Sequence, residues 1–248
     1  MTTSRQPSEE EIKKLPVVGV LGVAPYATIS FLEKIANLTP AKKDWEHVHL
    51  VIDNNVHIPS RGRHVMYHEA SPVPAMIDSC AKLAAYPVDF IVVPCNNASA
   101  YIDHVAPHIS MPIINIIAVA ASALLNKHPQ AKNCAVLGGQ VTYSLETYRK
   151  FLEQAGISYI KHSLELQKEI DSVIESIKLG NIAEAPKATR AIIDRLVRDY
   201  GADSVIFGCT ELGCIEVESP IPCIDSSSEL AAYVAEKGRK SKTNEKNR

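Results

Sequence analysis

Two cysteines occur in matching surroundings in the two halves of the chain. Cys95 follows the largely β-branched run Phe90–Val93, and Cys209 follows the similar run Ser204–Phe207. A strand that ends in a cysteine-bearing turn presents the sulfur at the carboxyl edge of a parallel sheet, where open α/β proteins bind ligands. If the turn opens a helix, free N–H groups and the helix dipole favour a thiolate over a thiol. The repetition indicates a pair of acid/base groups that act on opposite faces of one substrate.

The other cysteines and the histidines indicate neither a disulfide framework nor a metal site. Six cysteines in 248 residues are too few to stabilise a chain of this length by disulfides. No CxxC pair occurs, and five histidines in the first third have no known ligand spacing, so we expect no metal. The cysteines expected as reduced packing residues are Cys80, Cys134, Cys214 and Cys223, and the histidines are His47, His49, His57, His64 and His68.

Alternating strand and helix patterns must position the two cysteines. The predicted strands are Val17–Gly22, Val48–Asp53, Phe90–Val93, Pro112–Asn115, Cys134–Gly138, Ser158–Lys161, Ser204–Phe207 and Pro222–Ile224. The predicted helices are Thr28–Ala36, Val73–Ala85, Ser99–Pro107, Ile116–Leu125, Tyr143–Gln154, Leu166–Lys178, Ala188–Asp199 and Glu229–Glu236. This alternation requires parallel sheets that are covered on both faces. The predicted fold class is therefore α/β, with two similar flavodoxin-like lobes that face each other across a cleft.

The lobes divide the chain near its middle. We expect residues 1–115 to form the first lobe, completed by a C-terminal helix over 225–237, and residues 116–224 to form the second. Residues 238–248 are polar and basic and lack apolar anchors, so we predict a disordered tail.

Composition excludes several classes of partner. A hydrophobic content of 46% and a charged content of 22% are typical of a soluble globular protein. The net charge of −2 gives no electrostatic reason to bind nucleic acid or an anionic membrane. No apolar run is long enough to span a bilayer, and the N-terminus has no signal-peptide core, so we expect a cytoplasmic protein.

The cysteine segments belong to an ordered series of motifs. PCNNASAY surrounds Cys95, and GCTEL begins one residue before Cys209. Further blocks are GVLGVAPYAT (Gly19–Thr28), PAKKDWEH (Pro40–His47), NNVHIPSR (Asn54–Arg61), TYSLETY (Thr142–Tyr148) and ELQKEI (Glu165–Ile170). The series resembles that of the cofactor-independent aspartate/glutamate racemases, and most closely their aspartate racemase branch. The resemblance covers nearly the whole chain.

The resemblance implies a racemase that interconverts L- and D-aspartate, with glutamate as a second acidic substrate, in a homodimer without pyridoxal phosphate or another cofactor. Removing an α-proton without an electron sink gives a poorly stabilised carbanion. A racemase must take the proton from one face and return one on the other. Cysteine, with a free pKa of about 8.5, can serve as base or as acid once its site is tuned. By resemblance, Cys95 and Cys209 are this catalytic pair.

The resemblance also implies how the substrate is held at its α-carboxylate. Asn96, Asn97 and Thr210 follow the two cysteines and supply amide, hydroxyl and backbone N–H donors there. Thr142 matches a family threonine near the ligand.

Two cations match the family residues that hold the distal carboxylate. They are Arg61, in IPSR, and Lys168, in ELQKEI. Arginine suits a bidentate grip on a planar carboxylate. Arg63 is a nearby alternative to Arg61.

Departures from the family pattern leave other functions open. The family's Gly-Gly-Met-Gly-Pro loop reads Gly22–Pro25 here, with one residue fewer and two glycines missing. Asn97 stands where threonine is usual, and Ser99 stands where histidine is usual. A related cysteine-dependent isomerase or decarboxylase of a dicarboxylic acid is one alternative. A catalytically silent amino-acid-binding protein is another.

Overall fold

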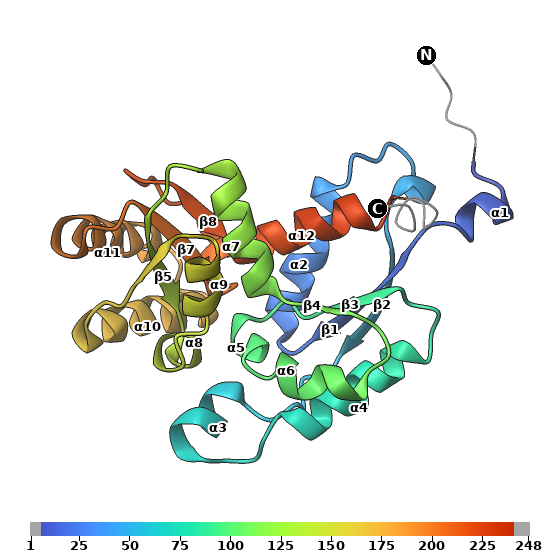
Figure 1. Ribbon diagram of the computed structural model, residues 1–248, viewed down its shortest axis with the longest axis horizontal. Helices are drawn as coiled ribbons and strands as arrows, with labels where there is room; N and C mark the ends of the chain where they lie inside the picture. The colour runs from blue at the N-terminus through green and yellow to red at the C-terminus, as the bar shows by residue number, and fades with distance from the viewer. Residues whose placement is uncertain (1–5, 241–248) are drawn as a thin grey trace.

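The computed structural model describes residues 6–240 as two parallel β-sheets surrounded by helices (Figure 1). The first sheet has the order β2-β1-β3-β4 and the second has the equivalent order β6-β5-β7-β8, with every strand pair parallel. The strands are β1 Val17–Gly22, β2 His49–Asn54, β3 Phe90–Val92, β4 Ile113–Ile114, β5 Asn133–Gly138, β6 Ser158–Ile160, β7 Ser204–Gly208 and β8 Cys223–Asp225. The predicted α/β class with two similar lobes is confirmed.

Helices connect successive strands of each sheet, as is usual for parallel pairing, except that β7 and β8 are joined through a short 3₁₀ turn. Those of the first half are α1 Glu9–Ile12, α2 Pro25–Leu38, α3 Arg61–Tyr67, α4 Val73–Ala84, α5 Asn96–Ser99 and α6 Ile102–Val105. Those that follow are α7 Ile116–Lys127, α8 Gln140–Ser144, α9 Arg149–Gln154, α10 Leu164–Lys178, α11 Ala185–Tyr200 and α12 Ser226–Lys237. Short 3₁₀ turns are η1 Asp44–Glu46, η2 Ala106–His108 and η3 Leu212–Cys214.

Two predicted helices are interrupted, and α3 was not predicted. The predicted helix Ser99–Pro107 consists of α6 and η2, with a turn separating α6 from α5. The predicted helix Tyr143–Gln154 breaks at Glu146, whose φ of 47° is left-handed. Helix α3 has no buried residue, so it carries no apolar periodicity. It begins where the Ser60 hydroxyl accepts a hydrogen bond from the backbone N–H of Arg63 at 3.2 Å.

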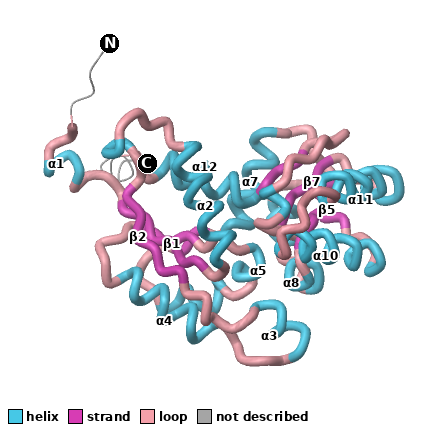
Figure 2. Tube along the Cα trace, turned by 180° about the vertical axis from the view of Figure 1, so that it is seen from behind, coloured by secondary structure: helices cyan, strands magenta, loops and turns pink. Residues whose placement is uncertain are grey.

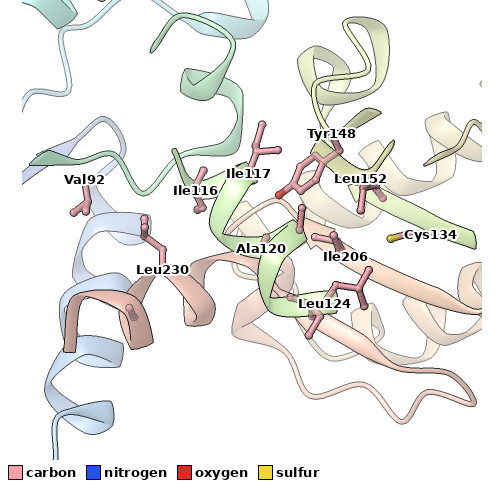
Figure 3. Close-up of a cluster of buried hydrophobic side chains, with 14 of the residues drawn as sticks. Val92, Ile116, Ile117, Ala120, Leu124, Cys134, Tyr148, Leu152, Ile206 and Leu230 are labelled. Carbon is pink, nitrogen blue, oxygen red and sulfur yellow. The ribbon is translucent and has the colours of Figure 1, made fainter. Parts of the chain in front are cut away.

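One continuous apolar core joins the two sheets. Helices α7 and α12 pack against each other, and α12 also packs along α2 (Figures 1 and 2). Figure 3 shows Ile116, Ala120 and Leu124 of α7 between Val92 of the first sheet and Ile206 of the second. The small side chain of Ala120 is fully buried, which lets α7 approach its neighbours closely.

Strands β1–β4 end before residue 115 and β5–β8 lie between residues 133 and 225, and the division of the chain into lobes at 115/116 and 224/225 stays a prediction. Helix α12 contacts both α2 and α7, so its assignment to the first lobe stays a prediction. Of the predicted tail, residues 241–248 lie outside the described residues. No helix within residues 6–240 has both the length and the apolarity needed to cross a membrane.

Candidate active site

Both cysteine turns line one small cavity of about 170 Å³, which we call the thiol cavity. The turn after β3 contributes residues 94–97, and the turn after β7 contributes residues 208–211. Ala24 and Ala27, which follow β1, line it as well. The cavity therefore forms where the carboxyl ends of strands from both sheets meet, as expected for ligand sites in open α/β folds. The structure brings Cys95 and Cys209 together at one site.

The turns that carry the two sulfurs differ from the expected strand–helix junction. Cys95 is the N-cap of α5, which is only four residues long. Cys209 is followed by no α-helix, because the chain passes through Thr210 and Glu211 into the 3₁₀ turn η3. A helix dipole is the sum of aligned peptide dipoles, so such short segments contribute little. The condition under which a helix N-terminus would favour a thiolate is therefore met at Cys95, by a helix of four residues, and is not met at Cys209.

Burial and a neighbouring carboxylate together favour the protonated form of Cys209. The Cys209 thiol donates a hydrogen bond to Oε2 of Glu211 at 2.9 Å, and the Thr210 hydroxyl donates to the same oxygen at 3.2 Å. Burial raises the pKa of Cys209 well above its ordinary value, and the Glu211 carboxylate raises this pKa further. The positive charge of Lys178 acts in the opposite direction on the same pKa. Cys209 therefore rests as the neutral thiol, the form that can give up a proton.

Asn96 and Asn97 have different roles despite being adjacent. Asn96 is 3% exposed, and its amide is bonded to the hydroxyl groups of Tyr148 and Ser226. Asn96 also lines the thiol cavity, and one of its two amide hydrogens has no acceptor among the described residues, so its predicted contact with the substrate carboxylate stays a prediction. Oδ1 of Asn97 accepts a hydrogen bond from the Thr142 hydroxyl at 3.2 Å, which leaves the Asn97 amide hydrogens for a ligand. Asn97 and Thr210 line the thiol cavity, as predicted.

Thr142 contacts Asn97 from outside the thiol cavity. It is 1% exposed and does not line the thiol cavity. An added Cβ on Gly138, at the end of β5, would lie 2.6 Å from Cγ2 of Thr142. The absence of a side chain at Gly138 thus allows Thr142 to reach Asn97, and the predicted ligand contact of Thr142 is indirect.

Arg61 brings an uncompensated positive charge to the thiol cavity. Its terminal nitrogens donate to three backbone carbonyl oxygens at 3.3–3.4 Å, and its Nε is buried without a partner among the described residues. A buried guanidinium without a carboxylate is costly, and an anionic ligand would supply the missing bonds. The alternative residue, Arg63, is exposed and its Nε donates to Glu69 at 2.7 Å. The structure therefore favours Arg61 as the substrate-binding cation.

The cation that α10 contributes to the site lies almost three helical turns beyond the predicted residue. Lys168 is exposed along α10 and lines neither the thiol cavity nor the chamber beside it. Lys178, the last residue of α10, lines both. The ten residues between them correspond to about 15 Å along a helix axis. We therefore replace Lys168 with Lys178 as the cation contributed by α10.

A larger, mostly apolar chamber of about 590 Å³ opens beside the thiol cavity. We call it the apolar chamber. Ala24, Ala27, Lys178, Thr210 and Glu211 line both spaces. The remaining lining comes from the β1–α2 junction, the α10–α11 region and η3: Pro25, Tyr26, Ile177, Leu179, Gly180, Ile182 and Cys214. The shortened loop noted in the sequence therefore forms part of its wall.

Sequence reasoning missed Lys178 and Glu211. Glu211 lies inside the GCTEL motif, so its position two residues after a cysteine was a usable signal. Lys178 offered only a basic residue in the last turn of a helix. Within residues 6–240, no group of three histidine, cysteine, aspartate or glutamate side chains could hold a metal ion.

Known proteins resemble the chain along nearly its whole length. The Asp/Glu/Hydantoin racemase family profile matches residues 20–234. The broad specificity amino-acid racemase RacX of Bacillus subtilis (strain 168) is 30% identical over 222 residues, covering 87% of this chain and 95% of RacX. The solved Picrophilus torridus aspartate racemase has 27% identity and a TM-score of 0.75, covering 92% of this chain and 97% of its own. The glutamate racemase of Aquifex pyrophilus is 26% identical over 152 residues, covering 58% of this chain and 56% of that protein. The chain therefore belongs to the Asp/Glu/Hydantoin racemase family, as the sequence motifs predicted.

Proposed function

We propose that this protein racemises an acidic amino acid, with aspartate as the preferred substrate, by a two-base mechanism that needs no cofactor. The supporting observation is that two thiols from different sheets share the thiol cavity with the uncompensated guanidinium of Arg61. Two acid/base groups match the chemistry of inversion, and a half-buried cation without a carboxylate partner among the described residues matches a second carboxylate of the substrate. At about 170 Å³ the thiol cavity is smaller than the roughly 300–1,000 Å³ of drug-sized sites, which suits a small amino acid.

In this mechanism Cys95 begins as the thiolate and Cys209 as the thiol. The bond between the α-carbon and its hydrogen breaks, and the proton moves to the Cys95 sulfur. The Cys209 S–H delivers a proton to the opposite face, which leaves a Cys209 thiolate beside Glu211. Proton exchange with solvent restores the starting state, and the opposite enantiomer uses the two groups in exchanged roles.

Different residues around the thiol cavity bind the different charged groups of the substrate. The Asn97 amide holds the α-carboxylate together with the backbone N–H groups of the two turns, including that of Thr210. Arg61 binds the distal carboxylate, and Lys178 adds positive potential on the second-lobe side. Glu211 has the charge needed to attract the substrate ammonium group. These assignments follow from lining positions and charge signs at the thiol cavity.

A broader amino-acid racemase is a second candidate, favoured by the apolar chamber. Side chains too long for the thiol cavity could extend between the β1–α2 and α10–α11 turns, where Ile177, Leu179 and Ile182 offer apolar contacts. The 30% identity to a broad specificity racemase supports this candidate.

Proton exchange in deuterium oxide tests both candidates. The protein is incubated separately with L-aspartate, L-glutamate and L-leucine, and α-deuteration is followed by NMR while chiral chromatography follows inversion. The proposed function predicts α-deuterated D-aspartate at the highest catalytic efficiency. Comparable efficiency for leucine would favour the broader racemase.

Two other results would contradict racemisation altogether. Turnover of a dicarboxylic acid without α-exchange of any amino acid would indicate the related isomerase or decarboxylase. Calorimetric binding of aspartate without exchange would indicate a silent binding protein.

A further inference from the structure

A line of buried hydrogen bonds connects the two segments that carry the thiols. The Tyr148 hydroxyl donates to Oδ1 of Asn96, and Nδ2 of Asn96 donates to the Ser226 hydroxyl at 2.9 Å. The Ser226 hydroxyl then donates to the backbone carbonyl of Phe207 at 2.8 Å. We call these four residues the buried network. Each hydroxyl group in it donates to an acceptor, and Asn96 is held through both its amide oxygen and its amide nitrogen, which favours one geometry.

The buried network is sealed from solvent. Tyr148 and Ser226 are 0% exposed, and Asn96 is 3% exposed. Burial raises the pKa of Tyr148 far above its ordinary value, so its hydroxyl stays protonated and remains a donor. Removing either hydroxyl would leave an amide group of Asn96 without its partner in a place that water does not reach.

Two members of the buried network lie next to the turns that carry the thiols. Asn96 directly follows Cys95, and Phe207 precedes Cys209 by two residues. The Tyr148 ring also lies against the second turn, since an added Cβ on Gly208 would be 3.2 Å from its Cε2 atom. The buried network therefore connects the backbone of one thiol segment to that of the other.

We propose that Tyr148 and Ser226 are positioning residues that set the separation of the Cys95 and Cys209 sulfurs across the substrate. The inference rests on the proposed two-base racemisation. The thiols follow β3 and β7, which belong to different sheets, so no strand ladder sets their spacing. Contacts between the lobes must therefore set the distance between the two sulfurs. The buried network is a polar contact of this kind, and it includes residues one and two positions from the two cysteines in sequence. Misplacement of a reacting group by about 1 Å can lower a rate about 100-fold.

Substitution of each hydroxyl tests the proposal. Tyr148→Phe and Ser226→Ala should each lower kcat for racemisation by about tenfold to a hundredfold. KM should change little, because the substrate-binding groups remain. In deuterium oxide, badly spaced thiols should still allow one cysteine to remove the α-proton and return deuterium on the same face. The ratio of exchange with retention to exchange with inversion should therefore rise well above that of the wild type.

This ratio separates positioning from simple loss of folded protein. A smaller folded fraction lowers retention and inversion equally, so the ratio would stay unchanged. Tyr143→Phe is the matched control, because the Tyr143 hydroxyl donates to the backbone carbonyl of His162 at 3.0 Å and does not take part in the buried network. It should keep the wild-type ratio. The double variant Tyr148→Phe/Ser226→Ala should be little worse than the poorer single variant, because both changes break one coupled unit.

The outcomes distinguish this inference from the proposed function. If Tyr148→Phe and Ser226→Ala racemise aspartate with the wild-type ratio and kcat, the positioning role is wrong while racemisation stands. If the wild type exchanges no amino acid, the proposed function itself fails. Should Tyr148→Phe not fold, Ser226→Ala, which removes a smaller group, decides the matter alone.

Discussion

The two walls of the thiol cavity have the same construction but different charge. The first-lobe wall carries Cys95 and Arg61, and the second-lobe wall carries Cys209, Lys178 and Glu211. Each wall thus supplies one thiol and one cation from an equivalent strand order. Only the second adds a carboxylate, since no acidic side chain in the described part of the chain is bonded to the Cys95 sulfur.

The comparison separates what the repeated fold provides from what local side chains add. Repetition places two sulfurs at equivalent sheet edges, which an inversion reaction requires. Glu211 then favours the proton on Cys209, which leaves Cys95 as the base in the proposed mechanism. The L- and D-forms have equal free energies in solution, so kcat/KM must be equal in the two directions. The difference in charge between the two walls should therefore appear in reactions that use only one of the two thiols and in the pH dependence of kcat/KM.

Removing either sulfur should have the largest effect. Cys95→Ala and Cys209→Ala should each lower racemisation by about 10²–10⁴-fold, because one acid/base group is lost. Elimination of hydrogen halide from a β-halogenated aspartate needs a single base, so each variant should retain elimination for one enantiomer only, and for opposite enantiomers. Chiral analysis of the remaining analogue measures this. Cys223→Ala, away from the thiol cavity, is the control, and wild-type racemisation by either active-site variant would refute the two-base assignment.

The cation of the first wall should determine acidic specificity. Arg61→Leu should lower kcat/KM for aspartate relative to alanine by about tenfold to a hundredfold, since charge-assisted hydrogen bonds are worth about 1.5–3 kcal/mol. Parallel assays of both amino acids give the ratio. Arg63→Leu, two residues further along α3, should leave it unchanged, because Arg63 pairs with Glu69 on the surface. An equal loss for both amino acids in Arg61→Leu would contradict recognition of the distal carboxylate.

The carboxylate of the second wall should set the alkaline limit of activity. Because the Cys209 pKa is raised, the thiol persists to higher pH, and activity is lost as pH rises through that pKa. Glu211→Gln removes the negative charge, so the alkaline limb of the kcat/KM profile should move to lower pH. A shift of about one pH unit would mean about tenfold lower activity above both inflections. Glu216→Gln, exposed further along the same loop, is the control. An unmoved limb would show that Glu211 does not control Cys209.

The indirect contact through Thr142 should have the smallest effect. Thr142→Val keeps the shape but removes the hydrogen bond that orients Asn97. One neutral hydrogen bond contributes about 0.5–1.5 kcal/mol, so KM for aspartate should rise by about twofold to tenfold with little change in kcat. Thr189→Val is the matched control, since the hydroxyl of this buried threonine donates to the backbone carbonyl of Ala185 within α11. A larger loss of kcat than of substrate affinity would place Thr142 in the catalytic step instead.

Local patterns predicted the scaffold better than the detailed contacts. Buried strands and the turns after them follow from runs of β-branched residues, so both cysteines could be placed on sheet edges from sequence. The role of Asn96 could not, because its partners Tyr148 and Ser226 are 52 and 130 residues away. The choice between Lys168 and Lys178 depended on where the end of α10 meets the other lobe. Such long-range placement leaves no periodic signal in one sequence.

The position of α12 affects how the protein folds during its synthesis. The first sheet has all its strands once Ile114 has been made, but α12, which buries Leu230 and Val234 against the core containing Phe31 of α2, begins only at Ser226. At about 5–20 residues per second, the ribosome leaves that apolar surface uncovered for several seconds. Chaperones that bind exposed apolar segments have this interval in which to act. The first half of the chain, although it is synthesised first, therefore completes its packing only when α12, near the end of the chain, has been made.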